Sequence, residues 1–153
     1  MTTAGKTTVD PARVREFAAT AARLRSELGR RIGYENLWIK RDDLTAEPYG
    51  GNKPRKLEYA LAHARAAGYT SVVTQGGIGT NHGLATAIFC DRLGIRCTLL
   101  LYDQPVTENV KLTLLLLKKF RARLVYHKTL WRAMVCYYSV CRLKYPGAYF
   151  VYP

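Results

Sequence analysis

From Pro54 onward the chain alternates between two apolar patterns, and this alternation constrains the fold more than any other feature. Apolar residues at helical spacing predict helices from Pro54 to Gly68, from the turn before Leu84 to Gly94, from Pro105 to about Phe120, and from Trp131 to Pro146. Short apolar runs between them predict strands at 70–75, 96–102, 123–127 and 148–152. Strands that alternate with helices of this length form βαβ units, so we predict the α/β class, a parallel sheet with flanking helices.

The segment before Pro54 reads differently. Asp10-Pro11 is typical of a helix start, and apolar residues at steps of three and four continue to Gly29. The run 37–39 predicts a short strand, and the turn residues of 47–52 predict a loop. We therefore expect one helix and one strand ahead of the alternating part.

The last predicted helix carries an apolar stripe, and we expect this stripe to face the core. Its members are Trp131, Met134, Val135, Tyr138 and Cys141. The four cysteines show no C-x-x-C spacing and fall on predicted helices or at a strand start: Cys90, Cys97, Cys136 and Cys141. We interpret them as reduced core thiols rather than zinc ligands, and we expect no metal site.

Charge is distributed unevenly along the 153 residues, whose net charge is +13. The last acidic residue is Glu108, and nine bases follow it together with nine aromatic residues. This mixture is typical of nucleic-acid binding, which is one alternative for the function. Because Trp131 and Tyr138 lie on the predicted apolar stripe, we favour a core position for them and expect no nucleic-acid partner.

No segment predicts export or a membrane span. The apolar run Leu114–Leu117 is too short to cross a bilayer, and the first eight residues contain no apolar stretch. We therefore expect no membrane partner, a cytoplasmic location and reduced cysteines.

The first candidate for chemistry is Lys53, which follows Gly50-Gly51-Asn52 and precedes a proline. Proline disfavours the helical region for the residue before it, so Lys53 is predicted at or just outside a helix start. The positive end of the helix dipole favours the neutral amine, which a nucleophilic or Schiff-base lysine requires. A solvated lysine in a basic loop is the alternative interpretation.

The second candidate is the glycine-rich turn between a predicted strand and helix, Gln75-Gly76-Gly77-Ile78-Gly79-Thr80-Asn81-His82-Gly83. Glycines let the backbone approach a ligand, and a helix start offers free amides to an anion. The turn is not the dinucleotide fingerprint, because Gly83 comes one residue late, and no Lys-Ser/Thr pair makes it a P-loop. A tight turn capped by Thr80 or Asn81 is the alternative interpretation.

Three ordered motifs together resemble one family. They are Leu37-Trp38-Ile39-Lys40-Arg41-Asp42-Asp43-Leu44-Thr45, then Gly50-Gly51-Asn52-Lys53-x-Arg55-Lys56-Leu57-Glu58, then Gly76-Gly77-x-x-Thr80-Asn81-His82. They are similar to fold type II pyridoxal-phosphate enzymes of the tryptophan synthase β-subunit type. Within these, the chain resembles the branch of D-cysteine desulfhydrase and 1-aminocyclopropane-1-carboxylate deaminase.

The resemblance implies roles for particular residues. Lys53 would be the Schiff-base lysine that holds pyridoxal 5'-phosphate and moves protons at the substrate α-carbon. Asn81 would hydrogen-bond the ring hydroxyl oxygen of the cofactor. Gly79, Thr80, Asn81 and His82 would bind the carboxylate of a small amino-acid substrate, with Thr80, where relatives usually have serine, also in a catalytic role. The reaction would release ammonia and a 2-oxo acid.

The resemblance also implies a domain organisation. Residues 1–52 would form the N-terminal part of a large domain, and 53–153 the smaller α/β domain. In the family, the phosphate cradle, the partner of the pyridine nitrogen and part of the substrate pocket come later in the chain. We therefore expect a truncated chain whose full-length form is a homodimer, with a truncated non-catalytic remnant as a further alternative.

Overall fold

The computed structural model describes residues 31–34, 37 and 40–153, and the chain divides into two units, Met1–Leu44 and Thr45–Pro153. The first unit contains a 3-10 helix, η1 (Asp42–Leu44). Its first residue forms an ion pair with Lys40, in which the Asp42 Oδ1 and Lys40 Nζ atoms are 3.3 Å apart. The predicted helix from Asp10 to Gly29 lies outside the described residues. Most of the strand predicted at 37–39 does too.

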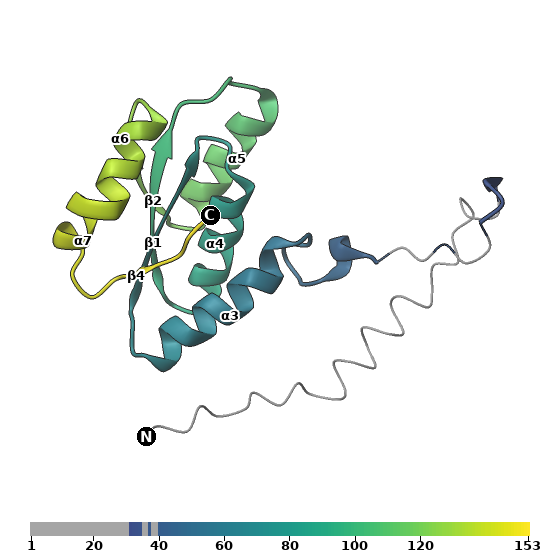
Figure 1. The fold of residues 1–153 in the computed structure, drawn as a ribbon, viewed down its shortest axis with the longest axis horizontal. Coiled ribbons are helices and arrows are strands. Elements are labelled where there is room, and N and C mark those ends of the chain that lie inside the picture. Colours follow the sequence, from purple (N-terminus) through teal and green to yellow (C-terminus); the bar gives the residue numbers. More distant parts are fainter. Residues whose placement is uncertain (1–30, 35–36, 38–39) are drawn as a thin grey trace. The chain divides into compact units, whose positions relative to one another are not determined.

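The second unit contains a four-stranded parallel sheet, which confirms the predicted α/β class (Figure 1). Its strands are β1 (Ser71–Gly77), β2 (Arg96–Tyr102), β3 (Arg123–Tyr126) and β4 (Tyr149–Phe150). The order is β3-β2-β1-β4, and all three pairings are parallel. The carboxyl ends of β1 and β2 therefore meet at one edge, where Gly77 pairs with Tyr102.

Helices cover both faces of this sheet (Figure 1). We call one side the α4 face; it carries α3 (Lys53–Ala66), α4 (Asn81–Arg92) and α5 (Glu108–Lys119). The opposite side is the α6 face, with α6 (Leu130–Val135), the π-helical turn η2 (Cys136–Val140) and α7 (Cys141–Lys144). The helices predicted from Pro54 onward are all present, whereas β4 is shorter than predicted.

Alternation along the strands separates two cores. The larger core lies on the α4 face and takes Val72 from β1 and Leu99 from β2. The smaller core lies on the α6 face and takes the next residues of the same strands, Val73 and Leu100. Because side chains of a strand point alternately to the two faces, both strands are buried on each side, as expected for a parallel sheet.

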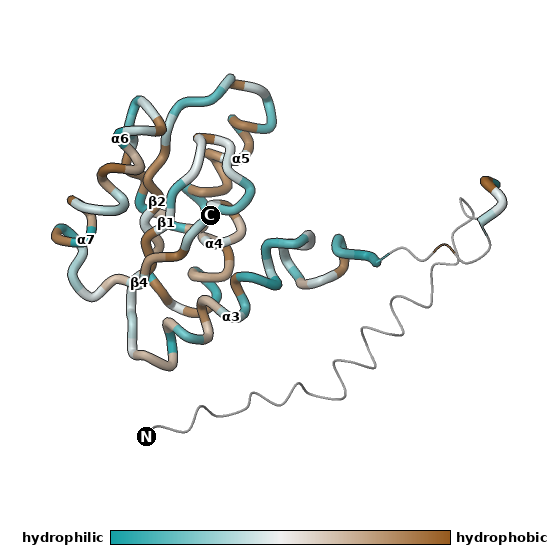
Figure 2. Tube along the Cα trace, in the orientation of Figure 1, coloured by the Kyte–Doolittle hydropathy of each residue, from teal (hydrophilic) through white to brown (hydrophobic). Residues whose placement is uncertain are grey.

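The predicted core stripe on the last helix is wrong for most of its members, and of the five only Cys141 is fully buried. Trp131 and Tyr138 are 72% and 50% exposed, and the buried residues of α6, η2 and α7 are Ala133, Tyr137 and Cys141. Successive members of this set are four residues apart, and in a regular α-helix of 3.6 residues per turn each would point in a slightly different direction from the one before. The wider π turn in η2 offsets that drift and keeps them on one line. Hydrophobic residues occur on α6 and α7 as well as on the strands (Figure 2).

The prediction of four reduced cysteines is also wrong. Cys136 and Cys141 form a disulfide, whose Cα atoms are 5.2 Å apart at the two ends of the π turn. Cys90 and Cys97 are free and buried, as predicted. The neighbouring Cys90 thiol and burial raise the pKa of Cys97. Within the described part of the chain, no helix has the length and apolar character that a bilayer span requires.

Candidate functional site

Lys53 is the first residue of α3, as its position directly before Pro54 predicts. The side chain is half-buried. The loop ahead of it is tied at two points. The Thr45 hydroxyl donates to the Gly51 carbonyl at 2.7 Å, and the Arg92 guanidinium of α4 donates to the Glu47 carbonyl at 2.9 Å. The lysine thus begins its helix from a loop that is fastened to the neighbouring helix.

The glycine-rich turn is packed tightly around Thr80. A Cβ atom added to Gly76 would come within 2.4 Å of the Thr80 Oγ1 atom, and one added to Gly83 within 2.4 Å of the Thr80 methyl. The Thr80 hydroxyl accepts a hydrogen bond of 3.1 Å from the Gly83 N–H and caps α4. The structure therefore places the Thr80 side chain between two glycines, in the capping position that the alternative interpretation predicted.

The start of α4 presents free backbone donors. Among the described residues, the N–H groups of Gly79, Asn81 and His82 have no backbone acceptor, whereas the Thr80 N–H donates to the Gly77 carbonyl at 3.0 Å. The helix has 12 residues, so its dipole adds positive potential at the same place. Free amides at a helix start are the chemistry that a carboxylate or phosphate requires.

His82 is buried in the first turn of α4, with 5% of its surface exposed. Its Nε2 atom lies 3.0 Å from the Thr74 hydroxyl, and that hydroxyl donates its only proton to the Val151 carbonyl at 2.7 Å. The ring must therefore donate from Nε2, which leaves Nδ1 as a buried acceptor without a partner among the described residues. Burial, with smaller contributions from Lys56 and Lys53, lowers the pKa of His82 to about 4.

Two lysines of α3 disfavour the protonation of His82 through their positive charge. Lys56 donates to the Tyr152 carbonyl, and burial followed by the charge of Lys53 lowers its pKa. Lys56 and Lys53 also lower the pKa of His82, and α3 packs against α4, so positive charge at the start of α3 acts on the first turn of α4. The fold thus brings the predicted Lys53 and the predicted glycine-rich turn together.

Asn81 is exposed at the start of α4 and has a partner that the sequence analysis missed. The Tyr49 hydroxyl donates to the Asn81 Oδ1 atom over 3.3 Å, from a position 32 residues earlier in the chain. Gln104 was missed as well. A Cβ atom on Gly77 would meet the Gln104 Oε1 atom at 2.1 Å, and one on Gly79 its Nε2 atom at 2.7 Å. Hydropathy spacing carries no signal for either contact, because both join segments far apart in the sequence.

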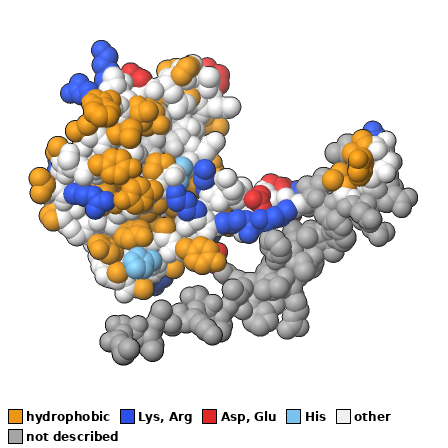
Figure 3. All heavy atoms as spheres, in the orientation of Figure 1, with side chains coloured by type: hydrophobic (Ala, Val, Ile, Leu, Met, Phe, Trp, Pro, Cys, Tyr) orange, Lys and Arg blue, Asp and Glu red, His pale blue; other side chains and the backbone are white. Residues whose placement is uncertain are grey.

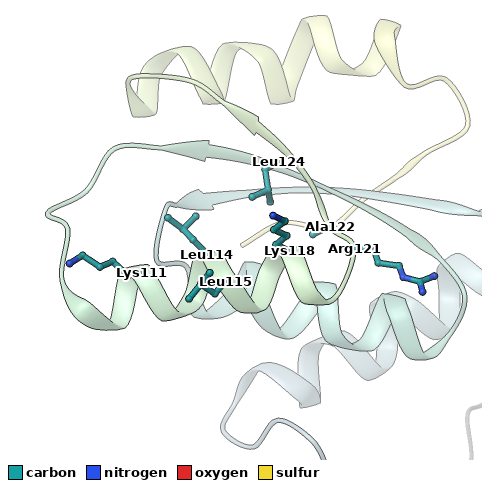
Figure 4. Close-up of a pocket in the computed structure, with 7 residues that line it drawn as sticks. All are labelled: Lys111, Leu114, Leu115, Lys118, Arg121, Ala122 and Leu124. Atoms are coloured by element: carbon teal, nitrogen blue, oxygen red, sulfur yellow. The ribbon is translucent and has the colours of Figure 1, made fainter.

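A shallow groove elsewhere contains none of the predicted site residues. It lies between α5 and β3 and is lined by Lys111, Leu114, Leu115, Lys118, Arg121, Ala122 and Leu124 (Figure 4). Its leucines come from both elements, and its basic side chains all come from α5 and the turn after it. The lining of this groove contains no acidic side chain and no buried polar side chain. The starts of α3 and α4 are therefore the better candidates for the chemistry of the chain.

Comparisons with known proteins identify the family of the chain. A family model described as pyridoxal-phosphate dependent enzyme matches residues 17–150. Nocardicin C-9' epimerase of Nocardia uniformis subsp. tsuyamanensis is 46% identical over 78 residues, which are 48% of this chain and 24% of that protein. D-cysteine desulfhydrase of Yersinia pestis (strain Pestoides F) is 43% identical over 88 residues, which are 58% of this chain and 25% of that protein.

A solved structure described as an ACC deaminase homologue has a TM-score of 0.65 and 30% sequence identity. The match covers 82% of this chain and 39% of that chain. The chain therefore spans about a quarter of the length of the curated relatives above and well under half of the solved one.

Proposed function

Because the chain belongs to the family of pyridoxal-phosphate dependent enzymes, we propose that it contains the lysine arm and the carboxylate-binding turn of a lyase or deaminase acting on a small amino acid. One observation carries the proposal. Lys53 begins α3, and the Tyr49 hydroxyl in the loop before it reaches Asn81 at the start of α4 over 3.3 Å, beside amides that have no backbone acceptor among the described residues.

The residues present fit part of the cofactor and its substrate. A Cβ atom on any glycine of the turn would clash with the side chain of Thr80 or Gln104, so the packing of the turn requires these glycines. The unpaired amides of Gly79, Asn81 and His82 suit the substrate carboxylate. When bound, pyridoxal phosphate supplies an electron sink for negative charge at the substrate α-carbon.

The chain's own residues then have distinct tasks. Lys53 would hold the cofactor through its amine and would take or return the α-proton of the substrate. Asn81 would donate from its amide to the ring oxygen of the cofactor. Thr80 holds the turn by capping α4, and His82 stays neutral at physiological pH because its pKa is about 4.

The overall reaction that we propose consumes water and releases ammonia and a 2-oxo acid. For a cysteine-like substrate, β-elimination also releases the sulfur as hydrogen sulfide. For a cyclopropane amino acid, the ring opens, and ammonia and the 2-oxo acid are the only products. The named relatives include an epimerase, a desulfhydrase and a deaminase homologue. Our proposal commits to the deaminating reactions and not to one substrate.

The wider setting belongs to the same proposal. Residues 1–52 form the N-terminal part of a large domain and 53–153 the smaller one. The enzyme is a cytoplasmic homodimer in its full-length form. The phosphate cradle and the pyridine-nitrogen partner are contributed by segments other than those described here.

The test is to mix the chain with pyridoxal phosphate, reduce with borohydride and map the modified lysine by mass spectrometry. We expect an adduct confined to Lys53 and its loss in Lys53→Ala. Lys111→Ala on exposed α5 is the matched control and retains the adduct. An adduct that survives Lys53→Ala, or modification scattered over many lysines, contradicts the proposal and favours a non-catalytic remnant.

A second candidate, nucleic-acid binding, rests on the exposure of Trp131 and Tyr138. Both lie among the nine bases that follow Glu108. Hydrophobic side chains interrupted by Lys and Arg gather on the side of α6, α7 and β4 (Figure 3). A titration of single-stranded DNA against salt decides it, since phosphate contacts make log affinity fall linearly with log salt concentration. Weak binding with a flat salt response excludes this candidate.

A further inference from the structure

Tyr49 lies in the tied loop before α3 and reaches the predicted cofactor contact of α4. Its ring packs against the larger core, and its hydroxyl donates to the Asn81 Oδ1 atom at 3.3 Å. Arg92 holds the same loop through the Glu47 carbonyl at 2.9 Å. The phenol therefore approaches Asn81 from a fixed direction.

The chemistry of a carboxamide makes this contact directional. One end of the Asn81 amide accepts and the other end donates, so a donor bound to Oδ1 decides where Nδ2 points. A phenol can serve as this donor only while it is protonated. Burial raises the pKa of Tyr49, which keeps the hydroxyl protonated through the neutral range.

We propose that Tyr49 is a positioning residue that fixes the Asn81 amide with its N–H end turned toward the ring oxygen of the cofactor. The inference rests on the proposed function, because the ring oxygen belongs to pyridoxal phosphate. Without the phenol, the amide turns freely and presents its oxygen part of the time, which repels an ionised ring oxygen. In this proposal Tyr49 acts through Asn81 alone.

The first arm of the test uses the chain alone. Side-chain amide signals in the ¹H–¹⁵N spectrum are assigned to Asn81 by comparison with Asn81→Asp. We expect Tyr49→Phe, which keeps the ring and removes the hydroxyl, to shift or broaden the Asn81 pair. Tyr59→Phe is the matched control, because Tyr59 is 72% exposed on α3, and it leaves the pair unchanged. An Asn81 pair that is the same in Tyr49→Phe overturns the proposal.

The second arm measures the concentration of pyridoxal phosphate needed to form the reducible adduct at Lys53. Loss of one hydrogen bond predicts a three- to tenfold higher concentration, roughly, for Tyr49→Phe. In an Asn81→Ala background the same substitution has no further effect, because the amide that it positions is gone. An undiminished effect in that background overturns the proposal. A chain that forms no Lys53 adduct at all refutes the proposed function instead, and the spectrum of the free chain still decides the positioning.

Discussion

The two faces of the sheet are both apolar in sequence, yet they are packed very differently. On the α4 face, every residue of α4 from His82 to Ile88 is buried, and its polar groups Thr80, His82 and Thr86 are hydrogen-bonded. On the α6 face, Trp131 is 72% and Leu143 is 85% exposed. Apolar composition therefore does not tell which face is closed, whereas buried polar side chains held by hydrogen bonds mark the face that contains the candidate site.

The largest effect is expected when one large side chain from each face is replaced by alanine and the two variants are compared. Leu99 of β2 is fully buried on the α4 face, so Leu99→Ala is expected to lower the free energy of unfolding by about 2–5 kcal/mol. Trp131→Ala on the α6 face is expected to change it by less than about 0.5 kcal/mol. Urea unfolding of both variants measures the two values. A cost for Trp131→Ala that approaches that of Leu99→Ala means that this face is covered in solution.

The next test uses the neutral histidine of the α4 face. The pKa of His82 falls from 6.5 to about 4, so below pH 6.5 the unfolded chain binds a proton that the folded chain refuses. Stability from this group is complete above pH 6.5 and is lost as the pH falls toward 4, by at most about 3 kcal/mol.

His82→Gln retains a donor toward Thr74 and removes the titration. The variant should therefore lose less unfolding free energy than the unchanged chain between pH 7 and pH 4.5, as measured in urea. Identical losses in the two proteins would show that His82 titrates normally in the folded chain.

A smaller effect is expected from filling the space at Gly83. Its added Cβ atom would lie 2.4 Å from the Thr80 methyl and 3.2 Å from the Leu99 Cδ2 atom, so Gly83→Ala should cost about 1–3 kcal/mol. Thr80→Ser keeps the capping hydroxyl and deletes the methyl, so the same substitution should cost less in that background. Helix propensity alone predicts the opposite sign, and a stabilised Gly83→Ala chain would show that the turn is loosely packed.

The smallest effect on stability is expected for a buried tyrosine of the α6 face. Tyr137 is fully buried, and its hydroxyl has no hydrogen-bond partner among the described residues. Burial raises the pKa of this phenol. Tyr137→Phe removes the unpaired group and is expected to stabilise the chain by about 1 kcal/mol in thermal or urea unfolding. Tyr138→Phe, at a half-exposed position, should leave the stability unchanged, and a destabilised Tyr137→Phe chain would reveal a partner for the hydroxyl.

Much of the fold could be predicted because its signals are local. The spacing of apolar residues gave the bounds of β2 correctly, and Pro54 placed Lys53 at the start of α3. The last helix failed for a physical reason. Residues 130–143 are apolar nearly all round, so spacing indicates a helix without selecting its inner face. The small side chain of Ala133 and the wide turn at η2 make that selection.

The site could be predicted only as far as its motifs reach. Lys53, Asn81 and the glycines stand in short patterns, whereas Tyr49, Thr74 and Val151 act through contacts that span 32 and 77 residues. Such contacts depend on strand order, which the sequence of one chain does not reveal. The disulfide was missed for a related reason, since the spacing of Cys136 and Cys141 is unremarkable until the π turn brings them together.

The bond from Thr74 to the Val151 carbonyl has a consequence for synthesis. Translation at about 5–20 residues per second needs roughly 4 to 15 seconds to add the 77 residues between them. During that time β1 lacks β4, and the Thr74 hydroxyl lacks the Val151 carbonyl that accepts its proton in the finished chain. A nascent chain paused before Val151 should therefore be an early target for chaperones or proteases. The lysine and its glycine-rich turn leave the ribosome early, and their surroundings are completed late.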